Sequence, residues 1–168
     1  MRILSPVFQH EGEIPKRFTC EGENISPEFS WEGAPQETKF FALIVHDPDA
    51  PRRNGFTHWL LYDIPASISR VRENVPRHEQ LADTALQGRN DSGEIGYIGP
   101  CPPSGRHRYY IRLYALRNKL GLPPGSTAEE VQRALDGKVI EQCEIMASYE
   151  KSGSGARSGS SRKSHATR

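Results

Sequence analysis

Residues 40–46 read Phe-Phe-Ala-Leu-Ile-Val-His, and they are the clearest evidence in the sequence for the fold. An almost continuous apolar run of this length predicts a β-strand that is buried on both faces. Residues 57–64, Thr-His-Trp-Leu-Leu-Tyr-Asp-Ile, are also rich in β-forming side chains and stop at Pro65. A third strand is predicted at residues 108–116, where side chains alternate between two faces.

The rest of the chain is rich in turns. Its 168 residues favour one domain, and they include 15 glycines and 13 prolines that lie between short apolar runs. This pattern favours a mainly β fold. Weaker strands are predicted near residues 2–8, 26–31 and 93–98.

Helical patterns appear only late in the sequence. Two overlapping capping boxes, at residues 126–129 and 127–130, predict a helix start. Gly137 is expected to divide the following apolar pattern into two short C-terminal helices. The residues at helical spacing are Val131, Leu135 and Val139, and then Ile140, Cys143 and Ala147.

Charge and hydropathy argue against several classes of protein. The net charge of +1 argues against a strongly basic nucleic-acid-binding protein. The mean hydropathy is −0.67, and no apolar run has the length of a membrane-spanning helix. The first residues lack the apolar segment of a signal peptide. We therefore expect a cytoplasmic protein without a transmembrane segment.

The composition changes after residue 150. Residues 151–168 are mostly Ser, Gly and basic residues, with no acid and no large apolar residue, which predicts a flexible tail behind a single domain of residues 1–150. Without the tail the domain has a net charge of −4. The tail is interpreted as a solvated end; the alternative is a basic arm that touches nucleic acid or anionic lipid.

Three cysteines are present, Cys20, Cys101 and Cys143, and they form no Cys-x-x-Cys motif. They cannot all pair within one chain. In a protein expected in the cytoplasm they are interpreted as thiols that pack as small apolar side chains.

Two dense segments carry the residues suited to chemistry. Residues 47–51, Asp-Pro-Asp-Ala-Pro, precede Thr57-His-Trp59, and residues 99–105, Gly-Pro-Cys-Pro-Pro-Ser-Gly, precede His107-Arg-Tyr109. Each joins a stiff loop to a strand end, because proline fixes φ. If the segments meet, one cleft beside Trp59 receives Asp47, Asp49, His58, His107 and Tyr109.

That set of side chains is compatible with three chemistries. Carboxylates and imidazoles can bind a divalent metal, or act as an acid/base pair. They can also form a polar cup for phosphate, provided that the carboxylates are paired or protonated or that the ligand carries an ammonium group. In a purely structural alternative the two aspartates cap turns, the histidines satisfy backbone groups, and Trp59 and Tyr109 are core residues. No motif for a catalytic nucleophile is present.

The two segments together resemble the signature regions of the phosphatidylethanolamine-binding protein family, also called the Raf kinase inhibitor protein family. Residues 14–31 and 90–97 resemble its short bacterial and archaeal branch. The resemblance implies a two-sheet antiparallel β-sandwich with short C-terminal helices, a homodimer, and no catalytic activity, cofactor or metal. It also implies a ligand-binding pocket lined by Asp47, Asp49, Pro51, His58, Trp59, Gly99, Pro100, His107 and Tyr109, with backbone donors from the Gly-Pro loop.

The predicted function is therefore binding of a small anionic or phosphorylated ligand, such as a phosphate or a phospholipid head group, with kinase-inhibitor-like regulation of a protein partner. No specific nucleic acid is expected as a partner. One alternative is an interaction module for a partner protein, in which the pocket is vestigial. The other is a metal-assisted phosphoesterase that uses Asp47, Asp49, His58 and His107.

Overall fold

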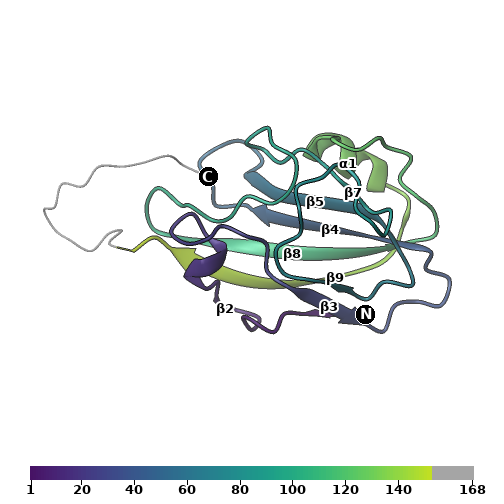
Figure 1. The fold of residues 1–168 in the computed structure, drawn as a ribbon, viewed down its shortest axis with the longest axis horizontal. Helices are drawn as coiled ribbons and strands as arrows, with labels where there is room; N and C mark the ends of the chain where they lie inside the picture. Colours follow the sequence, from purple (N-terminus) through teal and green to yellow (C-terminus); the bar gives the residue numbers. More distant parts are fainter. Residues whose placement is uncertain (153–168) are drawn as a thin grey trace, which may run out of the picture.

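The computed structural model describes residues 1–152, which form two β-sheets packed face to face (Figure 1). The smaller sheet has the order β1-β3-β6 and the larger the order β2-β9-β8-β4-β5-β7. All neighbouring strands are antiparallel except β2 and β9, which are parallel. The strands are β1 (Arg2–Leu4), β2 (Gly12–Glu13), β3 (Phe29–Glu32), β4 (Phe40–Asp47), β5 (Phe56–Pro65), β6 (Arg70–Val71), β7 (Leu86–Gln87), β8 (Arg106–Leu116) and β9 (Val139–Glu150).

The three strongest strand predictions are confirmed as β4, β5 and β8, which lie side by side in the larger sheet. The apolar residues of β4 contribute to cores on both sides of that sheet. Phe41, Leu43 and Val45 belong to the core between the sheets. Ala42 and Ile44 belong to the second core, on the outer face. The run at residues 40–46 is apolar throughout because both faces of this strand are covered.

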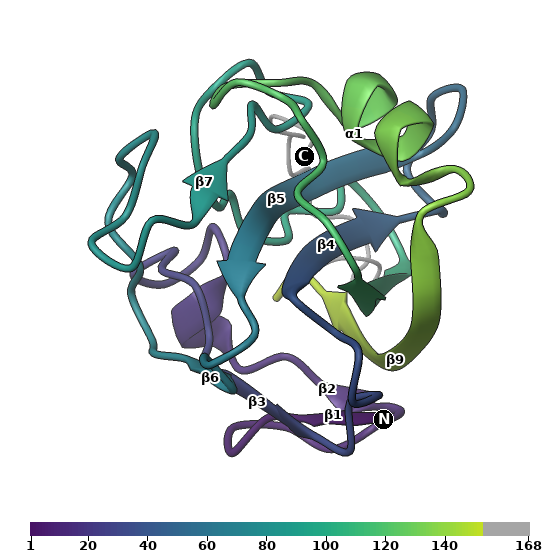
Figure 2. The same cartoon turned by 90° about the vertical axis from the view of Figure 1, so that its right-hand side faces the viewer.

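One helix covers the outer face, α1 (Ala128–Leu135), and its buried residues are Val131 and Leu135 (Figure 2). It begins as predicted, with a capping box between Thr127 and Glu130. Gly137 follows it at a φ of 78°, a conformation that favours glycine. A second, single-turn helix, the 3-10 helix η1 (Lys16–Phe18), lies near the amino terminus.

The predicted second C-terminal helix is wrong, because residues 139–150 form the long strand β9. Strand β9 pairs with β8 along its whole length, from Glu150 opposite Arg106 to Val139 opposite Leu116. Towards its end every second side chain is buried, at Ile145, Ala147 and Tyr149. Pairing with a buried neighbour strand overrides the helical spacing of the sequence.

The weaker strand predictions are confirmed only in part. Strand β1 covers the start of residues 2–8, and β3 overlaps the end of residues 26–31. The prediction at residues 93–98 is wrong, because this segment is a loop with a single bridge between Arg89 and Ile95. The predicted tail lies outside the described residues except for Lys151 and Ser152.

The cysteine interpretation is wrong for two of the three residues, since Cys20 and Cys101 form a disulfide and only Cys143 is a free thiol. Disulfides persist mainly in oxidising compartments, so the cytoplasmic location stays a prediction. Among residues 1–152, no helix is both long and apolar enough to span a membrane.

Candidate functional site

The two segments singled out in the sequence meet at one end of the larger sheet. Because β4 runs antiparallel to both β5 and β8, its carboxyl end lies beside their amino ends. His46 is opposite Tyr110 of β8, and Asp47 is opposite Phe56 of β5. This register brings Asp47 close to His107.

Asp47 and His107 form a buried ion pair. The Asp47 carboxylate is 0% exposed, and its Oδ2 lies 2.7 Å from His107 Nδ1. Its other oxygen accepts a hydrogen bond from the backbone N–H of Asp49 at 2.7 Å. Burial raises the pKa of Asp47, while the hydrogen bond from His107 opposes that shift. The carboxylate also holds the imidazole in place, with Nδ1 towards Asp47.

Asp49, two residues further on, has a different partner. Its two oxygens accept hydrogen bonds from Arg108 Nη2 and Nε, each at 2.9 Å, and one of them also accepts from the Arg108 backbone N–H. This bidentate contact lowers the pKa of Asp49 to about 2. Arg108 was not among the site residues predicted from the sequence, although it stands between His107 and Tyr109.

His58 is placed by an irregularity in the sheet. The pairing of β4 with β5 skips from Val45–Trp59 to His46–Thr57, which leaves His58 in a bulge. Its ring is fully buried against Phe56 and packs edge-on against Tyr109, with ring centroids 5.3 Å apart. Its Nδ1 lies 2.6 Å from the carbonyl oxygen of Ile98.

Tyr109 lies between the two imidazoles. Its ring stacks on His107 at a centroid distance of 6.4 Å and meets His58 on another side. The residue is 0% exposed, and its hydroxyl oxygen has no hydrogen-bond partner among residues 1–152. Burial raises the pKa of Tyr109, so the hydroxyl keeps its proton. A buried hydroxyl without a partner is rare in proteins and calls for a ligand, an ion or a water.

The Gly-Pro loop is fastened to the segment that follows η1. The Gly99 N–H donates to Asn24 Oδ1 at 2.8 Å, and the Pro100 carbonyl accepts from the Cys20 N–H at 3.0 Å. A Cβ atom at position 99 would collide with Phe18 O and with Asn24 Oδ1, so only glycine fits. The Gly99 N–H is therefore used inside the protein, and this loop contributes shape there rather than a donor for a ligand.

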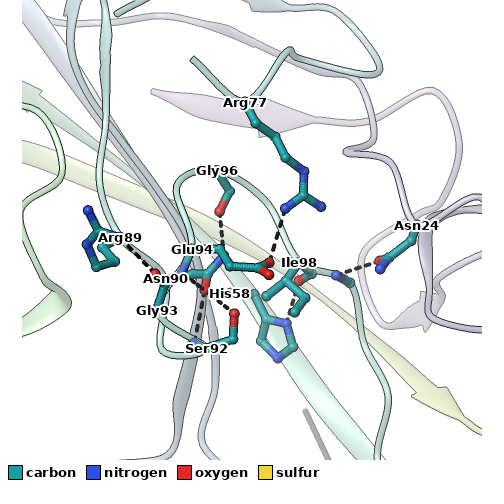
Figure 3. A network of polar contacts seen from close by, with 11 residues as sticks. Asn24, His58, Arg77, Arg89, Asn90, Ser92, Gly93, Glu94, Gly96 and Ile98 are labelled. Atoms are coloured by element: carbon teal, nitrogen blue, oxygen red, sulfur yellow. Dashed lines mark hydrogen bonds and ion pairs between the residues drawn. The ribbon is translucent and has the colours of Figure 1, made fainter. Parts of the chain in front are cut away.

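A second polar network shapes the loop that leads to Gly99 (Figure 3). The buried Asn90 side chain accepts hydrogen bonds from the Ser92 N–H, the Ser92 hydroxyl and the Glu94 N–H, and it donates to the Gly96 carbonyl. Side-chain bonds of this kind replace the ladder of a strand. They explain why residues 93–98 form a loop, which ends at the carbonyl that contacts His58.

Two residues named for the pocket lie away from its polar centre. Trp59 is fully buried in the core between the sheets, where its indole N–H donates to Gln87 Oε1 at 2.7 Å. Pro51 lies in the exposed turn between β4 and β5. Neither position excludes a part in shaping the site, but neither is in the group formed by Asp47, His58, His107 and Tyr109.

The charges at this site are balanced in pairs. Each aspartate has a basic partner, His107 for Asp47 and Arg108 for Asp49. A polar cup for phosphate requires that nearby carboxylates be paired, and this arrangement meets that requirement. Within residues 1–152, no three His, Cys, Asp or Glu side chains are grouped so that they could hold a metal ion.

Other cavities lie elsewhere. One of about 730 Å³ lies beside α1 and β9 and is lined mainly by polar residues, including Gln132 and Asp136. Another of about 490 Å³ is lined by apolar residues such as Ile64, Val71 and Leu81. Neither includes residues 47–59 or 99–109.

Comparison with known proteins gives consistent matches. The family model described as phosphatidylethanolamine-binding protein matches residues 4–150. A UPF0098 protein of Methanothermobacter thermautotrophicus is 48% identical over 149 residues, which cover 89% of this chain and 98% of the relative. A UPF0098 protein of Aquifex aeolicus is 43% identical, with 90% and 89% of the two chains covered.

Two solved structures share the fold. The phosphatidylethanolamine-binding protein homologue CT736 of Chlamydia trachomatis superposes with a TM-score of 0.81 at 40% identity, over 89% of this chain and 96% of that one. YbcL of E. coli, described as a member of the mammalian PEBP family, superposes with a TM-score of 0.84 at 34% identity, over 89% and 98%.

Proposed function

The chain belongs to the phosphatidylethanolamine-binding protein family, and from this premise we propose that it binds small anionic groups, phosphate or carboxylate, at the end of β4 and β8. The observation that carries the proposal is the Tyr109 hydroxyl, which is buried without a hydrogen-bond partner among residues 1–152. The aromatic ring of the same residue contacts the imidazoles of His58 and His107. A phosphate or carboxylate oxygen is an acceptor that would satisfy this hydroxyl.

His107 supports the same ligand. Because Asp47 occupies Nδ1, the imidazolium form of His107 has its Nε2–H directed away from the carboxylate and available to an anion. The residue is 7% exposed, so a ligand can reach the ring while most bulk water is excluded. Hydrogen bonds from an imidazolium to an anion are charge-assisted and strong.

The carboxylates of Asp47 and Asp49 repel a bound anion less strongly than two uncompensated negative charges would. Arg108 compensates the charge of Asp49, and His107 compensates that of Asp47. Binding of phosphate without turnover is therefore the function that the geometry supports best. Regulation of a protein partner and homodimer formation stay predictions.

The test is a titration with inorganic phosphate and with phosphoethanolamine, followed by amide chemical shifts. We expect saturable shifts in residues 47–59 and 99–109. Replacing Tyr109→Phe should weaken phosphate binding about tenfold, because one hydrogen bond to a charged ligand is lost. Its effect on stability should be small, since the hydroxyl removed has no partner among residues 1–152.

A matched control is Tyr62→Phe at the opposite end of β5. The Tyr62 hydroxyl donates to the Pro123 carbonyl at 2.6 Å, so its loss should reduce the free energy of unfolding by about 1 kcal/mol and leave phosphate affinity unchanged. Absence of shifts at millimolar ligand, or equal affinity in Tyr109→Phe and the parent, would exclude the assigned site. If a partner protein still bound such variants, the alternative function, an interaction module for a partner protein, would then be favoured.

A further inference from the structure

The Cys20–Cys101 disulfide joins the loop of the candidate site to a segment far away in the sequence. Cys101 follows Gly99 and Pro100, and Cys20 lies 81 residues earlier, in the turn after η1. We infer that this disulfide is a site of thiol–disulfide exchange whose state controls anion binding at the site. The inference rests on the proposed function.

The disulfide is part of a narrow seam between residues 18–24 and 97–101. Three hydrogen bonds cross the seam: Cys20 N–H to the Pro100 carbonyl, Gly99 N–H to Asn24, and the Tyr97 hydroxyl to the Phe18 carbonyl. All three are single bonds between loops rather than members of a sheet ladder. The covalent bond is therefore the strongest constraint on the position of the loop.

The seam is connected directly to the imidazole of His58. The Ile98 carbonyl, one residue before Gly99, lies 2.6 Å from His58 Nδ1. His58 in turn packs against Tyr109. A displacement of residues 98–101 therefore moves the group that holds His58 against the Tyr109 ring.

Residues 20 and 21, on the other side of the seam, are connected to the same site through β9. The Tyr149 hydroxyl is hydrogen-bonded to Glu21, the residue after Cys20. Tyr149 is the partner of His107 in the pairing of β8 with β9. Residues 20 and 21 thus contact both the loop beneath His58 and the strand beside His107.

The two cysteines differ in exposure. Cys101 is 5% exposed, whereas Cys20 is half-buried. The thiolate of a dithiol reductant therefore attacks Cys20 Sγ, and the sulfur of Cys101 leaves and takes up a proton. The second thiol of the reductant then displaces Cys20 and closes the reductant's own disulfide. Two electrons and two protons pass from the dithiol to the cysteine pair.

Reduction should leave the fold intact, because no strand of either sheet includes residues 18–24 or 97–101. It should lower the fraction of molecules whose loop has the binding arrangement, and apparent affinity falls in proportion to that fraction. If about one molecule in ten keeps the arrangement, phosphate affinity falls about tenfold.

The experiment uses the full chain in three states: oxidised, reduced with dithiothreitol, and reoxidised. Thiol titration of the denatured protein should count one thiol in the oxidised state, Cys143, and all three cysteines after reduction. Inorganic phosphate is titrated against each state. We expect about tenfold weaker binding after reduction, recovery on reoxidation, and faster hydrogen exchange at the Gly99 amide with unchanged exchange in β4 and β8.

Two variants complete the design. Cys20→Ser with Cys101→Ser should resemble the reduced protein in either state, and Cys143→Ser should behave as the parent. Equal phosphate affinity in the oxidised and reduced states, with the thiol counts as expected, would overturn the inference and leave the proposed function standing. Absence of phosphate binding in the oxidised protein would instead refute the proposed function, and the inference would fall with it.

Discussion

The same three strands, β4, β5 and β8, border two contrasting regions. On the outer face of the sheet Ile44, Leu60 and Tyr114 form an apolar cluster beneath α1. At the carboxyl end of β4 the buried groups are polar, with the Asp47–His107 ion pair beside Tyr109. Both regions exclude water, and in the second the Tyr109 hydroxyl is buried with no hydrogen-bond partner in the described part of the chain.

The proposed function implies that one sheet divides stability and function between these regions. Buried apolar side chains on the helix-covered face stabilise the fold through the area that they remove from water. At the polar end buried charges cost free energy and stabilise little, even when they are paired. In the proposed function these polar groups serve to bind a ligand. Substitutions at matched positions in the two regions can separate these roles.

The largest effect is expected on the apolar, helix-covered face. Leu60→Ala removes a side chain that is 1% exposed in the cluster beneath α1, and should lower the free energy of unfolding by about 3 kcal/mol through lost burial and a cavity. Denaturant unfolding measures this change, and phosphate affinity of the folded variant should equal that of the parent.

The control for this prediction is Leu4→Ala, because Leu4 is 39% exposed. The same atoms are removed there, and the expected change is within about 0.5 kcal/mol. A weaker phosphate affinity in folded Leu60→Ala would show that the two regions are coupled and would contradict this division of roles.

An intermediate effect is expected from Asp47→Asn, and here affinity rather than stability should change. The variant keeps an acceptor for the Asp49 N–H but loses the negative charge that pairs with His107. We expect about tenfold weaker phosphate binding, or about 1.4 kcal/mol, measured by calorimetry.

The matched variant is Asp63→Asn, at the other end of β5. Asp63 is also buried, and it accepts a hydrogen bond from the Leu120 N–H at 3.0 Å, which an asparagine oxygen can replace. It should bind phosphate as the parent does. Equal losses of affinity in both variants would mean that Asp47 has no special part in binding.

Local patterns in the sequence predicted the elements that local interactions determine. The apolar run at residues 40–46 requires a doubly covered strand, and the Thr127–Glu130 capping box fixes the start of α1. Strand β9 was not predictable in this way, because its residues satisfy a helical spacing and become a strand only through pairing with β8. The arrangement of two sheets in a sandwich was predicted from the family resemblance and not from local patterns.

The candidate site was predictable as a group of segments and not in its details. The sequence placed Asp47, His107 and Tyr109 together, but it treated Asp49 as equivalent to Asp47, although Arg108 binds it separately. The bulge at His58 and the Cys20–Cys101 disulfide depend on contacts between distant segments. A count of three cysteines cannot show which two pair.

The smallest effect is expected at Asp49, and its dependence on pH distinguishes the two aspartates. Arg108 holds the pKa of Asp49 at about 2 in the folded protein, below the ordinary value of 3.8. The stability that this pair contributes is therefore fully present above pH 3.8 and is lost as the pH falls towards 2. Because the Arg108 side chain is half exposed, that contribution should be small.

Asp49→Asn should remove this acid-dependent loss, as measured by denaturant unfolding at a series of pH values between 4 and 2. Arg108→Gln should remove most of it, because only the hydrogen bond from the backbone N–H of residue 108 to Asp49 remains. The double variant should lose nothing beyond Asp49→Asn. Phosphate affinity in Asp49→Asn should not decrease, since Arg108 is then left without its carboxylate. A loss as large as that in Asp47→Asn would make both aspartates part of one charge system at the polar end.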